Sequence, residues 1–150
     1  MTEYKTNIPE LTLKYKSGEI KKVQIKSSKD AADYLRQMYD ADTIEACETA
    51  IVVYMNRKNN SIGWFKVSQG GISGTVIDVR LILATALKCL ASGMIICHNH
   101  PSGNTDPSDS DLKITQKLKE AGATMDIQLL DHIILTPDGS YFSFADEGLL

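Results

Sequence analysis

Two histidines and an aspartate have the spacing of metal ligands in the segment HNHPSGNTDPSDSD, residues 98–111. His98 and His100 follow an apolar run, and side chains at i and i+2 of an extended chain point the same way. The turn-forming residues after them fold the chain back, and we expect Ser108 to begin a helix whose first turn contains Asp111. Two imidazole nitrogens and one carboxylate suit Zn²⁺ and leave a fourth tetrahedral position for water. The spacing therefore predicts a catalytic type of site for one zinc ion.

Each part of this segment also has a purely structural interpretation. Ser108 and Asp111, three residues apart, match a helix capping box with aspartate in place of glutamate. A histidine pair of the form H-x-H is by itself a weak indication of a metal site. The combination favours a metal, and capping is compatible with ligation because the cap would fix the helix start that carries Asp111.

The elements around the segment predict an α/β domain in which helices cover a mixed β-sheet. The apolar run MIIC is typical of a central strand that ends where the histidines begin. Glycines are expected to end two of the helices: Gly93 ends the helix over 76–91, and Gly122 ends the helix that begins at Ser108. The expected helices cover residues 27–39, 76–91 and 108–122. The expected strands cover 11–15 and 19–25, which form a hairpin, and then 49–55, 62–68, 94–97, 126–135 (one strand or two) and 141–144.

The pattern H-x-H-P-x6-S-x2-D in this segment resembles the metal signature of the JAMM (MPN+) domain at every position. Three sequence motifs, HNHPSG at 98–103, LDHIIL at 130–135 and YFSF at 141–144, are similar to those of the RadC family of bacterial JAB-domain proteins. The similarity covers roughly residues 40–150. The resemblance implies a single domain of JAB/MPN type, related in layout to the cytidine deaminases. The deaminase signature, H-x-E with P-C-x-x-C, is absent from the sequence, which argues against deamination of a base. We therefore expect an N-terminal extension of hairpin and helix, 1–39, and a JAB/MPN+ domain, 40–150, in one compact unit.

The resemblance implies that the two histidines and the aspartate are the zinc ligands, and it adds two catalytic side chains. JAMM enzymes use a glutamate near an early strand as general base, and Glu48, which adjoins the strand TAIVVYM, is preferred over Glu45. Ser108 would donate a hydrogen bond to the tetrahedral oxyanion. His132, in the apolar run LLDHIIL, is expected to be structural or to support the site from behind, and Asp131 to pair with it or with a backbone group.

These residues predict zinc-dependent hydrolysis of a peptide or isopeptide bond, with a protein or peptide as the substrate. One alternative is a DNA-repair accessory or DNA-acting protein, and another is a non-catalytic binding module that keeps the JAB fold. Only the resemblance suggests DNA as a partner. RadC proteins commonly carry a helix-hairpin-helix DNA-binding region ahead of the JAB domain, whereas this sequence predicts a hairpin and one helix there, which argues against DNA contact. The net charge of −3 also differs from the basic balance typical of proteins that bind duplex DNA. Degenerate JAB members lose ligands, whereas this chain retains all of them, which favours the enzyme.

The composition of the 150 residues, 43% hydrophobic and 23% charged, is typical of one soluble globular domain. The start MTEYKTNIPE lacks the basic and then apolar pattern of a signal sequence, and no apolar run approaches the length of a membrane span. We therefore expect a cytoplasmic protein without a membrane partner. The sequence leaves its oligomeric state open.

Overall fold

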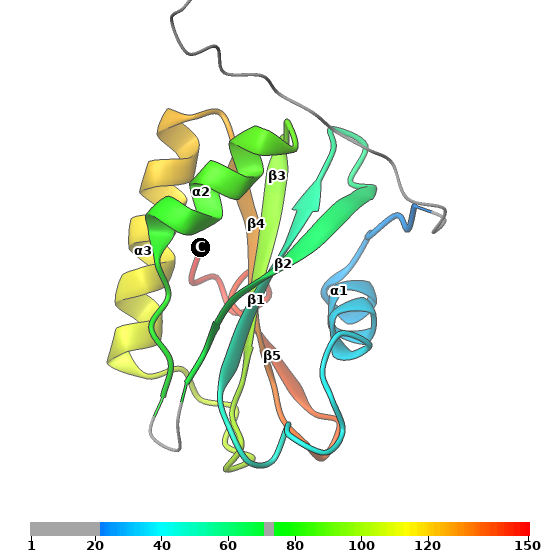
Figure 1. The fold of residues 1–150 in the computed structure, drawn as a ribbon, viewed down its shortest axis with the longest axis vertical. Helices are drawn as coiled ribbons and strands as arrows, with labels where there is room; N and C mark the ends of the chain where they lie inside the picture. The colour runs from blue at the N-terminus through cyan, green and yellow to red at the C-terminus, as the bar shows by residue number, and fades with distance from the viewer. Residues whose placement is uncertain (1–21, 71–73) are drawn as a thin grey trace, which may run out of the picture.

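A computed structural model describes residues 22–70 and 74–150 of the chain. In this described part, a five-stranded sheet has the order β2-β1-β3-β4-β5, and three helices pack on it (Figure 1). The pair β3–β4 is parallel and the other pairs are antiparallel, so the predicted α/β fold with a mixed sheet is confirmed. The elements in chain order are α1 (Ser28–Arg36), β1 (Thr49–Met55), β2 (Ser61–Gln69), α2 (Val79–Lys88), β3 (Gly93–Asn99), α3 (Asp109–Thr124), β4 (Gln128–Leu135) and β5 (Tyr141–Ser143).

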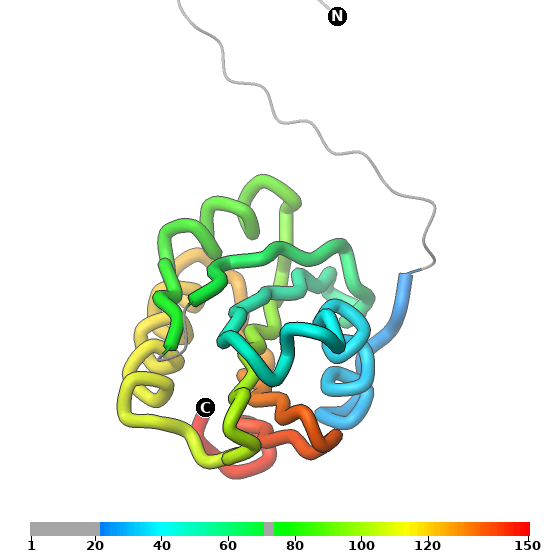
Figure 2. The backbone as a smooth tube through the Cα atoms, turned by 60° about the horizontal axis from the view of Figure 1, so that its bottom comes forward, coloured from blue at the N-terminus to red at the C-terminus, as the bar shows by residue number. Residues whose placement is uncertain are grey.

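The sheet separates two apolar layers, with α2 and α3 on one face and α1 on the other (Figures 1 and 2). Because side chains alternate along a strand, Val52 of β1 packs in the layer under α2 and α3, whereas Val53 packs in the layer under α1. In β3, Ile96 belongs to the first layer and Cys97 to the second. The same alternation turns the next residue, His98, toward the face that carries α3.

Each of the three described helices begins at a side chain that caps it, as expected for serine and aspartate at this position. Ser27 accepts a hydrogen bond from the backbone of Asp30 at the start of α1, and Asp78 caps α2. At the start of α3, Ser108 and Asp111 form the reciprocal capping box that the sequence indicates. The box holds Asp111 in the first turn of α3.

Neither glycine ends the helix that it was expected to end. Helix α2 covers less than the predicted 76–91, and the chain turns away at Leu90, whose φ of 56° lies in the left-handed region. Gly93 is instead the first residue of β3. Gly122 lies inside α3, which continues to Thr124, and a Cβ at Gly122 would clash with the carbonyl oxygen of Ile127. Gly122 is therefore explained by close packing rather than by a helix end.

Two further expectations about strands change. Strand β3 continues to Asn99, so His98 lies within the strand rather than after it, and β4 is one strand. Of the predicted hairpin, 11–15 and 19–21 lie outside the described residues, and within 22–25 Gln24 forms an isolated bridge with Asn60. The division of the chain after residue 39 stays a prediction, although Leu35 of α1 is fully buried in the layer against the sheet. Among the described helices, none has the length and apolar character to cross a membrane.

Candidate metal centre

His98 at the end of β3, His100 just after it and Asp111 of α3 bring their side chains together. The Nε2 atoms of His98 and His100 are 2.9 Å apart. Asp111 places Oδ1 3.3 Å from Nε2 of His98 and Oδ2 3.5 Å from Nε2 of His100. Ligand atoms around a tetrahedral Zn²⁺, at about 2.0–2.1 Å from the metal, are about 3.3 Å from one another. The three side chains therefore have the spacing of a metal site and could bind one ion.

The tautomer of His100 follows from its second ring nitrogen. Nδ1 of His100 lies 2.6 Å from the carbonyl oxygen of Asn104, which can only accept a hydrogen bond. Nδ1 must therefore carry the proton, and in the neutral ring Nε2 has a free lone pair. That lone pair faces His98 and Asp111.

The tautomer of His98 is set by a chain of hydrogen bonds that passes through two other buried residues. The hydroxyl of Thr115 donates to the carbonyl oxygen of Asp111 at 2.6 Å, so its oxygen accepts from Nδ1 of His132, also at 2.6 Å. Burial, and next the nearby His98, hold the pKa of His132 well below its usual value, so the ring is neutral and its Nε2 is an acceptor. Nδ1 of His98, 2.8 Å away, is then the donor, and Nε2 of His98 has a free lone pair.

The same network leaves Asp111 ionised. Burial raises the pKa of the Asp111 carboxyl. In the metal-free protein, however, a ring of His100 or His98 that carries a proton on Nε2 donates a hydrogen bond to this carboxylate, and these interactions outweigh burial and hold the pKa of Asp111 well below its usual range. The hydrogen bond with Asp111 in turn raises the pKa of His100. Two imidazole lone pairs and one carboxylate therefore converge on one point, an arrangement that a divalent cation would stabilise.

Glu48 stands next to this cluster, directly before β1. Ala50 pairs with His98 across the β1–β3 ladder, and alternation turns Glu48, two residues earlier, toward the same face. Its Oε1 lies 4.0 Å from Nε2 of His98, and its side chain is 20% exposed, so the carboxylate reaches solvent as well as the cluster. Glu45 is exposed and lies against a surface pocket with Pro101 and Asp138. The geometry thus favours Glu48 over Glu45 as the carboxylate of this site.

Ser108 contacts Asp111 through both halves of the capping box. Its backbone N–H donates to Oδ2 of Asp111 at 2.8 Å, and its hydroxyl oxygen accepts from the backbone N–H of Asp111 at 3.1 Å. Because the oxygen acts as an acceptor in the box, the hydroxyl keeps its own proton for another partner. Ser108 can therefore cap α3 and donate a hydrogen bond at the same time.

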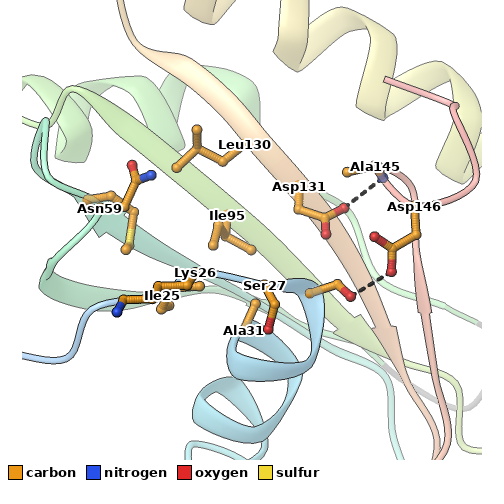
Figure 3. Close-up of a pocket in the computed structure, with 12 residues that line it drawn as sticks. Ile25, Lys26, Ser27, Ala31, Asn59, Ile95, Leu130, Asp131, Ala145 and Asp146 are labelled. Atoms are coloured by element: carbon orange, nitrogen blue, oxygen red, sulfur yellow. Dashed lines mark hydrogen bonds between the residues drawn. The ribbon is translucent and has the colours of Figure 1, made fainter.

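His132 and Asp131 are adjacent in β4 but belong to opposite faces of the sheet. The ring of His132 stacks on Phe144 with 4.5 Å between centroids and stands behind His98. Asp131 accepts from the hydroxyl of Ser143 and from the backbone of Ala145 and His132, so its partners include a backbone group and not the His132 ring. Asp131 lines a cavity of about 280 Å³. Figure 3 shows this cavity beside α1, on the face of the sheet away from His98 and His132.

Sequence reasoning missed Thr115 and Asn104, which fix the two imidazole tautomers. Thr115 lies four residues after Asp111 in α3, and that helical spacing was a usable signal that both residues face the same way. Asn104 contributes only its backbone carbonyl, for which the residue type carries no signal.

Comparison with known proteins identifies the family to which this chain is similar. The family described as "RadC-like JAB domain" matches residues 25–149. A UPF0758 protein of Flavobacterium johnsoniae is 47% identical over 98 residues, which are 65% of this chain and 42% of that protein. A UPF0758 protein of Aquifex aeolicus is 36% identical over 141 residues, or 94% of this chain and 58% of that protein.

The chain spans about half the length of these relatives. The family match nevertheless includes every residue of the metal cluster, together with α1 and the whole described sheet. It confirms the resemblance inferred from the HNHPSG segment. The chain belongs to the family of RadC-like JAB domains.

Proposed function

We propose that this chain is a zinc-dependent hydrolase that cleaves a peptide or isopeptide bond in a protein or peptide substrate. The observation that carries the proposal is the convergence of two imidazole lone pairs and one carboxylate beside a second carboxylate, that of Glu48. Oε1 of Glu48 lies 4.0 Å from Nε2 of His98. A site that only bound a structural metal would have its coordination completed by protein ligands, whereas three ligands with an open position are typical of a catalytic site.

His98, His100 and Asp111 would hold the metal, since their lone pairs are free and their spacing fits. When bound there, Zn²⁺ would polarise the scissile carbonyl and lower the pKa of water from 15.7 toward about 7. The charge of Asp111 offsets part of the positive charge, and the buried His132 keeps His98 in the tautomer that ligation requires.

Glu48 would act as the general base. Its carboxylate takes a proton from the attacking water as the water oxygen bonds to the carbonyl carbon, and it passes that proton to the leaving amine as the C–N bond breaks. At 4.0 Å from Nε2 of His98, it is near enough to hydrogen-bond a water at the cluster. Ser108, with its hydroxyl proton free of the capping box, would donate to the oxyanion that forms on the carbonyl oxygen.

The test compares Glu48→Gln with Glu45→Gln in zinc-loaded protein, using a library of peptides and isopeptides. Glu48→Gln should keep its zinc and its fold, because the amide has the same volume, but hydrolysis should fall by about 10²–10⁴-fold. Glu45→Gln is the matched control, an exposed glutamate three residues earlier, and should change the rate little. Loss of activity in Glu45→Gln alone would move the base to Glu45. Equal activity in both variants and wild type would refute Glu48 as the general base. No hydrolysis by any of the three proteins would leave the non-catalytic binding module as the better hypothesis.

A further inference from the structure

Asn99 lies between the two histidines in sequence and points to the opposite face of the sheet. It is fully buried, and it follows Cys97 in the alternation of β3 that faces α1. A buried amide needs partners for two N–H groups and one carbonyl. All of these partners come from residues 44–49, the segment that leads into β1.

The three hydrogen bonds of Asn99 enclose Glu48. The Nδ2 group donates to the carbonyl of Cys47 at 2.9 Å and to the carbonyl of Ile44 at 2.8 Å. The Oδ1 atom accepts from the backbone N–H of Thr49 at 2.7 Å. The Cys47 carbonyl and the Thr49 N–H belong to the two peptide units on either side of the Glu48 Cα. One side chain therefore fixes both peptide planes that set the direction of the Glu48 side chain.

We propose that Asn99 is a positioning residue that holds Glu48 at the metal cluster, and this proposal rests on the proposed role of Glu48. Asn99 is covalently linked to both histidine ligands, so the clamp ties the base to the same strand end that carries the metal. A carboxylate in place of this amide would lack both donors, and a serine would offer one. A displacement of about 1 Å at a reacting group can cost about 10²-fold in rate. Proton transfer by Glu48 would depend on its position to this degree, and the clamp fixes that position.

The clamp acts on the base and not on the ligands. Asn99 makes no hydrogen bond with the rings of His98 or His100 among the contacts of the described residues, and those rings are fixed instead by His132 and Asn104. Removal of the Asn99 amide should therefore free Glu48 while the zinc site stays assembled. This separation distinguishes a positioning role from general support of the strand end.

The experiment is a double-mutant cycle on the full zinc-loaded chain with Asn99→Ala, Glu48→Gln and the pair. Asn99→Ala should keep about one zinc per chain, lower kcat by about 10²-fold and change KM little. In the Glu48→Gln background, the same change should cost less than about 3-fold, because the residue through which Asn99 acts is already disabled. Asn99→Ser replaces Asn99→Ala if thermal unfolding shows that the alanine variant does not fold.

Tyr39→Phe is the matched control. The Tyr39 hydroxyl donates to the carbonyl of Thr49 at 2.8 Å, which braces the same segment but not the peptide units that flank Glu48. This variant should keep its kcat within about 3-fold of wild type. A loss as large as that of Asn99→Ala would make the effect one of the whole segment and overturn the proposal.

Hydrogen exchange of the Thr49 amide supplies a readout that needs no activity. Asn99→Ala should accelerate this exchange by about 10-fold or more, because the amide loses its acceptor. Unchanged exchange would overturn the clamp whether or not the protein is active. Additive losses in the cycle, or loss of zinc from Asn99→Ala, would also overturn it. If Asn99→Ala shows the faster exchange but the wild-type protein hydrolyses no substrate, the clamp stands as a structural feature. That result would instead refute the proposed function and, with it, the role of Asn99 in that reaction.

Discussion

Thr115→Val changes a residue that touches no ligand ring and should nevertheless weaken zinc binding. Valine has a methyl group where threonine has its hydroxyl, so the substitution at this buried position, 3% exposed, removes no volume that would leave a cavity. It removes the oxygen that accepts the Nδ1 proton of His132. His132 must then either bury an unpaired N–H or move its proton to Nε2, where it would face Nδ1 of His98.

Both outcomes cost free energy of the same order. An unpaired buried donor costs about 1–3 kcal/mol. The alternative tautomer of His132 makes Nδ1 of His98 an acceptor and places a proton on Nε2 of His98, the atom that faces the metal cluster. Zinc binding would have to reverse that exchange, so its free energy should weaken by about 1–3 kcal/mol. The matching decrease in affinity is about 10–100-fold, the usual effect of removing a residue that orients a ligand.

The assay is a competition titration of wild type and Thr115→Val against a chelator of known zinc affinity, at one fixed pH. Thr124→Val is the control, because Thr124 makes the same hydrogen bond to a carbonyl four residues earlier in α3, that of Glu120, but is exposed and has no histidine partner. Thr124→Val should bind zinc as wild type does. Wild-type affinity in Thr115→Val would refute the tautomer argument.

Two further outcomes follow from the same contacts. Ser108→Ala should keep its zinc but lose about 10²–10³-fold in rate and about 1 kcal/mol of stability through the lost cap; a less stable variant with full activity would leave Ser108 as a cap only. In the metal-free protein, the raised pKa of His100 adds stability below its unfolded value of 6.5, and the lowered pKa of Asp111 adds stability above 3.8. The free energy of unfolding of wild type should therefore exceed that of His100→Gln most between pH 3.8 and 6.5. This difference should shrink as the pH rises through the raised pKa of His100. In denaturant titrations, a difference that does not depend on pH would contradict the His100–Asp111 pairing.

Local signals predicted much of the candidate site. The serine and aspartate of the capping box lie three residues apart, so their mutual geometry is set within one helical turn. The apolar run before His98 indicated a central strand, and the strand is there. These features depend on neighbours in sequence, which is why spacing alone located them.

Features that depend on distant residues could not be predicted in the same way. Gly122 looked like a helix end, but its real constraint is the carbonyl of Ile127, which the turn after α3 brings back against the helix. Asn99 looked like a spacer between two histidines, yet its partners lie about fifty residues earlier. The strand order that places β1 beside β3 creates these contacts, and no local pattern specifies that order.

Metal analysis of the purified protein tests the central claim most directly. Protein prepared without chelator should contain about one zinc per chain, and His100→Ala should contain almost none, because two ligands cannot hold the ion against buffer. Circular dichroism of the same samples checks that the variant is folded. Full zinc occupancy in folded His100→Ala would contradict the assignment of the His98, His100 and Asp111 cluster as the metal site.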